Sequence, residues 1–293
     1  MKKLTYGMLF ITFILFLGLG TFSNPMIANT VDTTDAERDL YLNIITSNKP
    51  QYEMVKSIVG DKHNVEYMFT NEKDSKDYIF NDETINNISN MDLFFYSGND
   101  FEPWSTKLIN KLNKSNLGTI NISRGIRVIQ NQVDNVNKEN IYFYSGLEEY
   151  KVALYNIKSA IQDKDPKNRD LYEENYNKAL EEIDKRINKI KENKKDLADY
   201  KFIELDNNLD YFYRGIGISP IKISNNKTIA SVISEDKLDP AKVIVLKDRE
   251  TPMTETGYKV ANLDRYDGNC SVQDLIERNY KSFYDLIEIK ENK

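Results

Sequence analysis

Short apolar runs alternate with amphipathic stretches from about residue 40 to the end of the chain. The short runs have the length and the β-branched or aromatic content of strands, and the stretches between them repeat apolar residues at helical spacing. The predicted strands are 42–46, 64–69, 93–96, 119–122, 202–205, 243–246 and 259–263. The predicted helices are 51–59, 104–112, a segment through Tyr211 and a closing helix after Ser271. Because strands that alternate with helices pair in parallel, this order predicts an α/β fold with parallel sheets.

A longer amphipathic segment separates the two groups of strands. Asp165 and Pro166 suit the N-cap and the first turn of a helix. Apolar residues then recur at steps of three and four, at Tyr176, Leu180, Ile183, Ile187 and Ile190. The spacing predicts one helix to about residue 195, roughly 45 Å long at the usual rise per residue. A coiled coil is the alternative, but the stripe covers few heptads.

These patterns predict two α/β lobes, each with a parallel sheet, joined by one long rigid helix and separated by a cleft. We expect a signal peptide or signal anchor at 1–28, a polar tether at 29–39 and an N-terminal lobe at 40–162. The linking helix is expected at 163–197 and the C-terminal lobe at 198–293. A length of 293 residues suits two domains of ordinary size.

The first residues have the pattern of an export signal. Lys2 and Lys3 precede an apolar run of about 19 residues, which is close to the length that spans a bilayer. An uncleaved anchor is therefore an alternative to cleavage after Ala28. A lipoprotein signal places a cysteine after the run, and LGLGTFS at 17–23 has none. We predict an exported protein at the cell surface or otherwise extracytoplasmic, attached to the membrane if the signal is uncleaved, and not a lipoprotein.

Charge and rare residues exclude several classes of function. A formal net charge of −6 gives no global positive field, so nucleic-acid binding is not expected. The single cysteine, Cys270, excludes an intramolecular disulfide and a zinc–thiolate cluster. The single histidine, His63, follows a turn and is expected at the surface. With no Gly-x-Ser-x-Gly elbow, phosphate loop or histidine–nucleophile pair, the sequence predicts a protein that is not an enzyme.

Several segments occur in a characteristic order along the exported part of the chain. They are VKSIVGDK at 55–62, MDLFFYSG at 91–98 with FEPW at 101–104, DPKN at 165–168 with YEEN at 172–175, and KVIVL at 242–246. Together they resemble the extracytoplasmic solute-binding proteins of zinc and manganese ABC importers, called cluster A-I. The resemblance implies a metal held in the cleft between the lobes and an ABC permease in the membrane as partner.

In that family four side chains hold the metal, and the resemblance places four residues of this chain at their positions. The two histidine positions carry Lys76, in DSKDY at 74–78, and Asn140, in ENIY at 139–142. The other two positions carry Asp206 and Asp264. Both carboxylates are therefore present, both imidazoles are replaced, and the histidine-rich loop of zinc-binding members is missing.

This set of side chains changes the metal that we expect. Zinc favours imidazole and thiolate ligands, whereas manganese accepts the oxygen atoms of Asp206, Asp264 and Asn140, with Asp77 near in sequence. A protonated Lys76 is no ligand and repels a cation. The expected metal binding is therefore weak, altered or lost, with manganese favoured over zinc if a divalent ion binds at all.

Two hypotheses remain open for Lys76. Its ammonium group either occupies the place of the metal and neutralises Asp206 and Asp264 through an ion pair, or lies in a solvated loop. For the whole chain, the first hypothesis is the monomeric substrate-binding component of a metal-type ABC importer. The alternative is a surface interaction or adhesion protein on the same scaffold, with no ligand in the cleft.

Overall fold

The computed structural model describes residues 39–70, 72–75, 78–98, 102–133, 136–206, 208–223 and 227–287. The described residues from Tyr41 onwards belong to one compact unit. The predictions for the signal segment, for all of the tether but residue 39, and for Lys76 and Asp77 lie outside the described residues. Among the helices that are described, none combines the length and the apolar character needed to cross a membrane.

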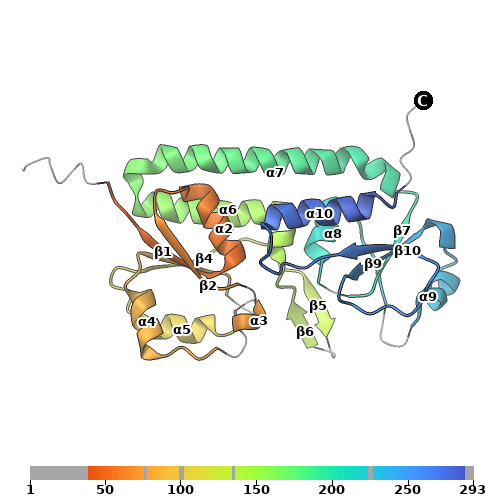
Figure 1. Ribbon diagram of the computed structural model, residues 1–293, viewed down its shortest axis with the longest axis horizontal. Helices are drawn as coiled ribbons and strands as arrows, with labels where there is room; N and C mark the ends of the chain where they lie inside the picture. Colours follow the sequence, from red (N-terminus) through yellow and green to blue (C-terminus); the bar gives the residue numbers. More distant parts are fainter. Residues whose placement is uncertain are drawn as a thin grey trace, which may run out of the picture. The chain divides into compact units, whose positions relative to one another are not determined.

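The first sheet has four parallel strands in the order β2-β1-β3-β4. They are β1 (Asn43–Asn48), β2 (Asn64–Phe69), β3 (Leu93–Tyr96) and β4 (Gly118–Asn121). The helices between them are α2 (Lys49–Val59), α3 (Glu72–Ser75), α4 (Asp82–Ser89) and α5 (Ser105–Lys111). Helix α2 lies on one face of this sheet, and α4 and α5 lie on the other (Figure 1). Apolar residues of α2 share one core with the strands, and those of α4 and α5 share another.

The second sheet also has four parallel strands, in the order β10-β9-β7-β8. They are β7 (Lys201–Glu204), β8 (Ile221–Lys222), β9 (Val243–Asp248) and β10 (Lys259–Leu263). Its helices are α8 (Asp210–Ile216), α9 (Ile229–Glu235), α10 (Val272–Tyr284) and the 3₁₀ turn η5 (Pro240–Lys242). The side chains of β7 and β9 alternate between a core shared with α9 and a core shared with α10.

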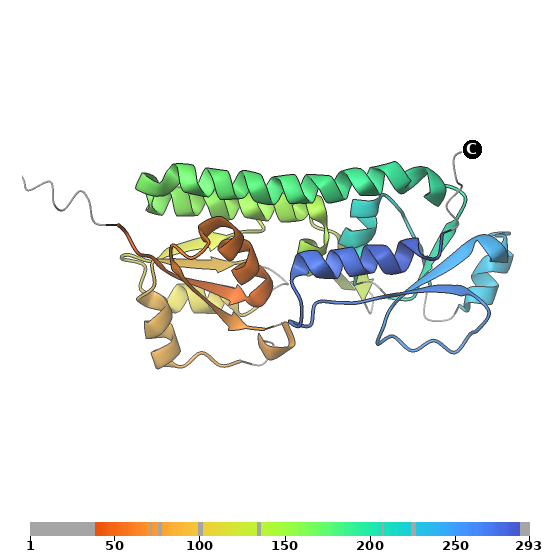
Figure 2. The ribbon, with the colours of Figure 1, turned by 45° about the horizontal axis from the view of Figure 1, so that its top comes forward.

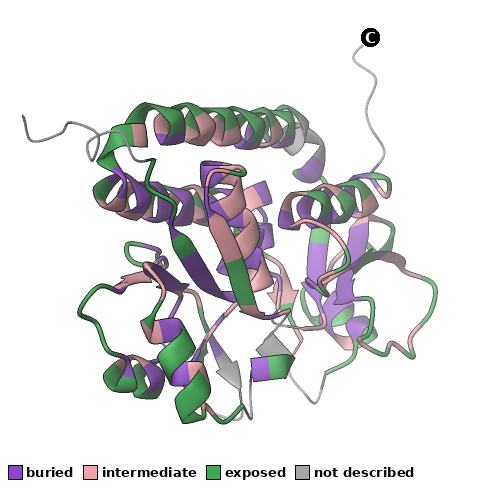
Figure 3. Cartoon of the chain, turned by 60° about the vertical axis from the view of Figure 1, so that its left-hand side comes forward, coloured by how far each residue is buried: buried purple, intermediate pink, exposed green. Residues whose placement is uncertain are grey.

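Two long helices connect the sheets. Helix α6 (Leu147–Lys164) is followed by the 3₁₀ turn η4 (Pro166–Asn168) and by α7 (Arg169–Leu197). Figures 1 and 2 show α7 lying along α6 and continuing beyond it towards α8. Buried and exposed positions alternate along α7, as expected for a helix that covers a core with one face (Figure 3).

A short segment before α6 adds a second kind of pairing. Strands β5 (Gln130–Val133) and β6 (Val136–Glu139) pair antiparallel, and the 3₁₀ turn η3 (Phe143–Ser145) leads into α6. The prediction of an α/β fold with parallel sheets in two lobes and one long helix is confirmed. This hairpin, α3, α4, α6, β8 and α9 were not predicted from the sequence.

The expectation that His63 lies at the surface is wrong, because its side chain is buried with only 3% of the residue exposed. The backbone N–H of Leu42 donates to Nδ1 of His63 over 3.3 Å, so Nε2 carries the proton of the neutral ring. Nε2 lies 2.6 Å from the hydroxyl group of Tyr172, which donates to Asp165 over 2.5 Å. This chain of hydrogen bonds connects β1 to the start of α7 and gives the histidine a structural role.

Candidate functional site

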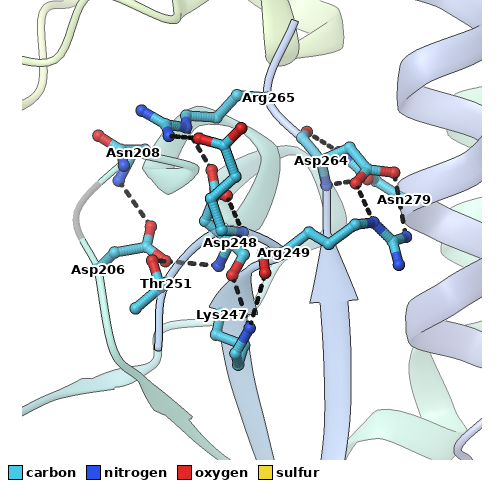
Figure 4. Close-up of polar contacts among 10 residues, drawn as sticks. Asp206, Asn208, Lys247, Asp248, Arg249, Thr251, Asp264, Arg265 and Asn279 are labelled. Carbon is cyan, nitrogen blue, oxygen red and sulfur yellow. Dashed lines mark hydrogen bonds and ion pairs between the residues drawn. The ribbon is translucent and has the colours of Figure 1, made fainter. Parts of the chain in front are cut away.

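Three aspartates lie at the carboxyl ends of neighbouring strands in the second sheet. Asp248 is the last residue of β9, Asp264 follows β10 directly, and Asp206 lies two residues after β7. Because β10, β9 and β7 are adjacent and parallel, these ends meet at one edge of the sheet (Figure 4). We call Asp206, Lys247–Glu250, Asp264 and Arg265 the acidic edge. The structure thus places Asp206 and Asp264 at the same edge, on either side of Asp248.

The carboxylate of Asp206 is bonded to the backbone around it. Its Oδ2 accepts from the N–H of Asp248 over 2.6 Å and from the hydroxyl group of Thr251 over 3.4 Å. Its Oδ1 accepts from the N–H of Asn208 over 3.2 Å. The two oxygen atoms of Asp206 therefore bond to the loop after β7 and to the end of β9 with the loop that follows it.

The carboxylate of Asp264 forms a two-bond ion pair with Arg249. The Nε and Nη2 atoms of Arg249 donate to Oδ1 over 2.6 Å and to Oδ2 over 3.3 Å. The backbone of Asp264 is fixed in turn by Asn279 of α10, whose side chain accepts from its N–H and donates to its carbonyl group, each over 2.8 Å. A guanidinium group therefore covers the second candidate ligand.

Asp248 is the most deeply buried acid of this edge, with 2% of the residue exposed. Its Oδ2 accepts from Nε of Arg265, and its Oδ1 accepts from the N–H of Glu250 over 2.8 Å. Arg265 also donates from Nη2 to Glu250 over 3.1 Å and forms a side-chain hydrogen bond with Tyr142. Burial alone would lower the pKa of Arg265, but the bond to Tyr142 and the charge of Asp248 hold that pKa above its ordinary value.

Asn140 belongs to a separate polar cluster. Its Nδ2 donates to Asp210 over 2.9 Å, and its Oδ1, the candidate ligand atom, accepts from the N–H of Tyr142 over 2.9 Å. Asp210 also accepts from Asn131 over 2.7 Å and from Lys222 over 2.6 Å. The Nδ2 atom of Asn140 is therefore bonded to the first residue of α8, and its Oδ1 atom is bonded to the backbone of Tyr142.

Glu204, at the end of β7, was not singled out from the sequence. Only 1% of the residue is exposed, and within the described parts of the chain neither carboxyl oxygen has a hydrogen-bond partner. Burial, followed by the negative charge of Asp210, raises the pKa of Glu204 to about 9. The side chain is therefore neutral at pH 7.

The donor atoms at the acidic edge do not suit a divalent ion in their present arrangement. Among the described residues, no group of three or more histidine, cysteine, aspartate or glutamate side chains is arranged to hold a metal. Asp264 and Asp248 are paired with arginines, and Asp206 is bonded to backbone. The hypothesis that Lys76 fills the metal position stays a prediction, since that residue lies outside the described ranges.

Sequence reasoning missed Asp248, Arg249 and Arg265, which together with Asp264 make the ion pairs of this edge. A signal for them does exist in the sequence. The dipeptide Asp-Arg occurs twice, at 248–249 in KDRE and at 264–265 in LDRY, each time after a predicted strand. Strands that end side by side with the same dipeptide bring two acids and two bases together.

The arrangement defines a class of two-lobed α/β proteins with acidic side chains at a sheet edge and a long helix joining the sheets. A family model described as "Zinc-uptake complex component A periplasmic" matches residues 44–251. The chain therefore belongs to the ZnuA family. This match includes the first sheet apart from the first residue of β1, and β7, β8 and β9 of the second sheet.

Curated relatives and solved structures agree with this assignment. The chain is 30% identical over 185 residues to the metal ABC transporter substrate-binding lipoprotein FimA of Streptococcus parasanguinis, covering 60% of this chain and 60% of FimA. It is 32% identical over 152 residues to the manganese ABC transporter substrate-binding lipoprotein PsaA of Streptococcus pneumoniae, covering 49% of each. The matched segments thus span about half to three fifths of these relatives.

A solved structure supports the fold. The metal-dependent lipoprotein YcdH of Bacillus subtilis superposes with a TM-score of 0.69 at 19% identity, covering 85% of this chain and 100% of that one. At this level of identity, the likeness shows a shared fold and no more.

The same comparisons correct one prediction. The relatives from Lactococcus lactis, Streptococcus parasanguinis and Streptococcus pneumoniae are all named substrate-binding lipoproteins. The prediction that this chain is not a lipoprotein is therefore wrong. The prediction rested on the absence of a cysteine after the apolar run, within a segment that lies outside the described residues.

Proposed function

We propose that the chain is the substrate-binding component of a metal-type ABC importer, with an ABC permease as its partner. The observation that carries the proposal is the family match across residues 44–251, which includes most of both sheets and all of α6 and α7. Relatives named as ABC transporter substrate-binding proteins for manganese and for iron support the same role. The family role is binding rather than catalysis, and we extend it to this chain.

We further propose that divalent metal binding is weak, altered or lost, with manganese favoured over zinc. Asp206, Asp264 and Asn140 offer only oxygen atoms, which suit manganese better than zinc. Each of these oxygen atoms is already bonded to the protein, to backbone N–H groups or to Arg249. A metal ion would have to displace those bonds as well as shed its own water.

Equilibrium dialysis of the full chain against Mn²⁺ or Zn²⁺, followed by elemental analysis, tests the ligand proposal. We expect less than one equivalent of metal per chain at micromolar free metal, with more manganese than zinc bound. A manganese-binding relative such as PsaA, dialysed in parallel, checks that the conditions permit binding. Stoichiometric binding of either metal at micromolar free concentration or below would contradict the proposal.

Cross-linking in the cells that produce the chain tests the partner. If the chain serves an importer, mass spectrometry of cross-linked material should recover an ABC permease subunit. Recovery of extracellular ligands with no permease would favour the adhesion alternative on the same scaffold. This outcome does not depend on whether a metal binds, so the two parts of the proposal are tested separately.

A further inference from the structure

The two Asp-Arg dipeptides of the acidic edge pair with each other across neighbouring strands. Asp248 and Leu263 are register partners in the β9–β10 ladder, so residues 248–249 and 264–265 lie side by side. Arg249 bonds to Asp264, and Arg265 bonds to Asp248. Each arginine thus pairs with the aspartate at the end of the neighbouring strand, as Figure 4 shows.

The charges of this edge nearly cancel. Asp206, Asp248, Glu250 and Asp264 carry four negative charges, while Lys247, Arg249 and Arg265 carry three positive ones, which leaves a net charge of −1. The ammonium group of Lys247 donates to the carbonyl oxygens of Asp248 and Arg249, over 2.9 and 3.2 Å. Among the described residues of the edge, the positive charge that faces the carboxylates therefore comes from the two arginines.

Arg265 is the more deeply buried of the two arginines. Its guanidinium group has three partners from different parts of the chain, namely Asp248 at the end of β9, Glu250 in the following loop and Tyr142 before α6. A planar group with five N–H donors can satisfy several oxygen acceptors at once, which a lysine does less well. The side chain is largely buried, with 26% exposed, so water screens these contacts only in part.

We propose that Arg249 and Arg265 take the place of a divalent cation at the acidic edge, so that the chain neutralises its own metal site. This inference rests on the proposed loss or weakening of metal binding, and it names the two arginines as the cause of that loss. It assigns the role of built-in cation to two arginines that follow β9 and β10. Without them the same edge carries a net charge of −3, and this charge attracts a divalent cation.

The double variant Arg249→Gln/Arg265→Gln tests the proposal, because it removes both positive charges and keeps polar side chains. We expect Mn²⁺ to bind the full-length double variant at least tenfold more tightly than the wild type, measured by equilibrium dialysis. The matched control is Arg214→Gln, because Arg214 bonds to Glu149 over 2.6 Å, outside this edge. The control should leave Mn²⁺ affinity within twofold of the wild type.

Two single variants keep the test decisive. Arg249→Gln should fold, since 60% of that side chain is exposed, and should bind Mn²⁺ more tightly than the wild type but less tightly than the double variant. Arg265→Lys keeps the charge and should show no gain. The proposal is overturned if a folded double variant gains no affinity, or if Arg249→Gln gains none when the double variant fails to fold. A gain in Arg265→Lys equal to that of the double variant would also overturn it.

The outcomes separate this inference from the proposed function. Tight metal binding by the wild type would contradict both the weakened binding and its cause. Weak binding by the wild type and by every folded variant would leave the proposed weak binding standing and overturn only the role of the arginines. Neither outcome depends on the permease, which the cross-linking experiment addresses.

Discussion

The hydroxyl group of Tyr266 donates a hydrogen bond of 2.7 Å to Oε1 of Glu53, which connects the loop after β10 to helix α2. The second carboxyl oxygen of Glu53 accepts from the N–H of Val272, in the first turn of α10, over 2.8 Å. Lys49, also in α2, donates to the carbonyl oxygen of Gly268 over 2.6 Å. Three bonds thus connect residues 266–272, which follow the last strand of the second sheet, to helix α2 beside the first sheet.

Replacing Glu53 by Ala should lower the free energy of unfolding by about 2 kcal/mol, because hydrogen bonds to a charged group are the stronger ones and the helix terminus loses its acceptor. Tyr266→Phe should cost about 1 kcal/mol, since one bond is lost and the ring is kept. Urea denaturation measures both. The double variant should cost less than the sum of the two, and strict additivity would show that the two side chains do not interact.

The sequence predicted the sheets well because their strands are short apolar runs with clear limits. Strands β2, β3 and β10 have the predicted bounds, and the Ser271 N-cap of α10 accepts from the N–H of Asp274 as a capping side chain should. Helix α6 was missed because it follows an aromatic run and buries polar residues such as Lys158 and Gln162, which weaken its apolar stripe. Lys158 is accommodated there by Glu173, over 2.8 Å.

The candidate site was only partly predictable. The resemblance led to Asp206 and Asp264, and the structure puts both at one sheet edge. The partners of Asp264 and Asp248 could not be predicted from the sequence, because they depend on the register between β9 and β10. That register brings residues 15 and 17 positions apart into contact. The burial of His63 likewise depends on Tyr172, more than a hundred residues away.

The single histidine should make stability depend on pH. Burial, as the largest cause, lowers the pKa of His63 below its ordinary value of 6.5, so the folded state favours the neutral ring more than the unfolded state does. Its contribution to stability is therefore complete above pH 6.5 and is lost as the pH falls below 6.5 towards the lowered value. Urea denaturation at pH 7.5, 6.5 and 5.5 should show this decline.

His63→Gln is the matched variant for that experiment, because it keeps a side chain that can donate and accept hydrogen bonds but does not titrate. The variant should be less stable than the wild type at pH 7.5, since the bonds to Leu42 and Tyr172 are weakened. Its stability should fall less steeply between pH 6.5 and 5.5. An equal slope in both proteins would show that other groups cause the pH dependence.

Glu204 should make the fold progressively less stable as the pH rises from 4.5 towards 9. A carboxyl group with a pKa of about 9 stays protonated in the fold, while in the unfolded chain it ionises above its ordinary value of 4.5. Its stabilising contribution is therefore complete below pH 4.5 and is lost progressively as the pH rises towards 9. Glu204→Met, of similar volume and without polar atoms, should raise the free energy of unfolding at pH 8 by about 1–3 kcal/mol.

The matched control for Glu204 is Glu149→Met. Glu149 is also largely buried, with 13% of its side chain exposed, but it is paired with Arg214 over 2.6 Å. Removing a paired acid leaves a half-buried guanidinium group without its partner, so this variant should be less stable than the wild type. We expect opposite signs for the two variants at pH 8. A loss of stability in Glu204→Met would contradict the absence of a partner for that carboxyl group among the described residues.

The loop after β10 approaches the end of β2 so closely that adding one methyl group to the loop should lower the stability of the fold. Gly268 has a φ of +84°, and a Cβ atom added to it would lie 2.4 Å from Cγ2 of Thr70. Gly257 has a φ of +93° with no atom within 4 Å of an added Cβ.

Replacing either glycine by Ala should lower the free energy of unfolding by about 1–2 kcal/mol, the cost of a left-handed backbone conformation for a residue with a Cβ. Gly268→Ala should cost about 1–3 kcal/mol more, because Thr70 must move. Adding Thr70→Ser to Gly268→Ala removes Cγ2 and should recover most of that additional loss of stability, as measured by urea denaturation. Equal losses for Gly268→Ala and Gly257→Ala would show that Thr70 moves aside at no cost in free energy.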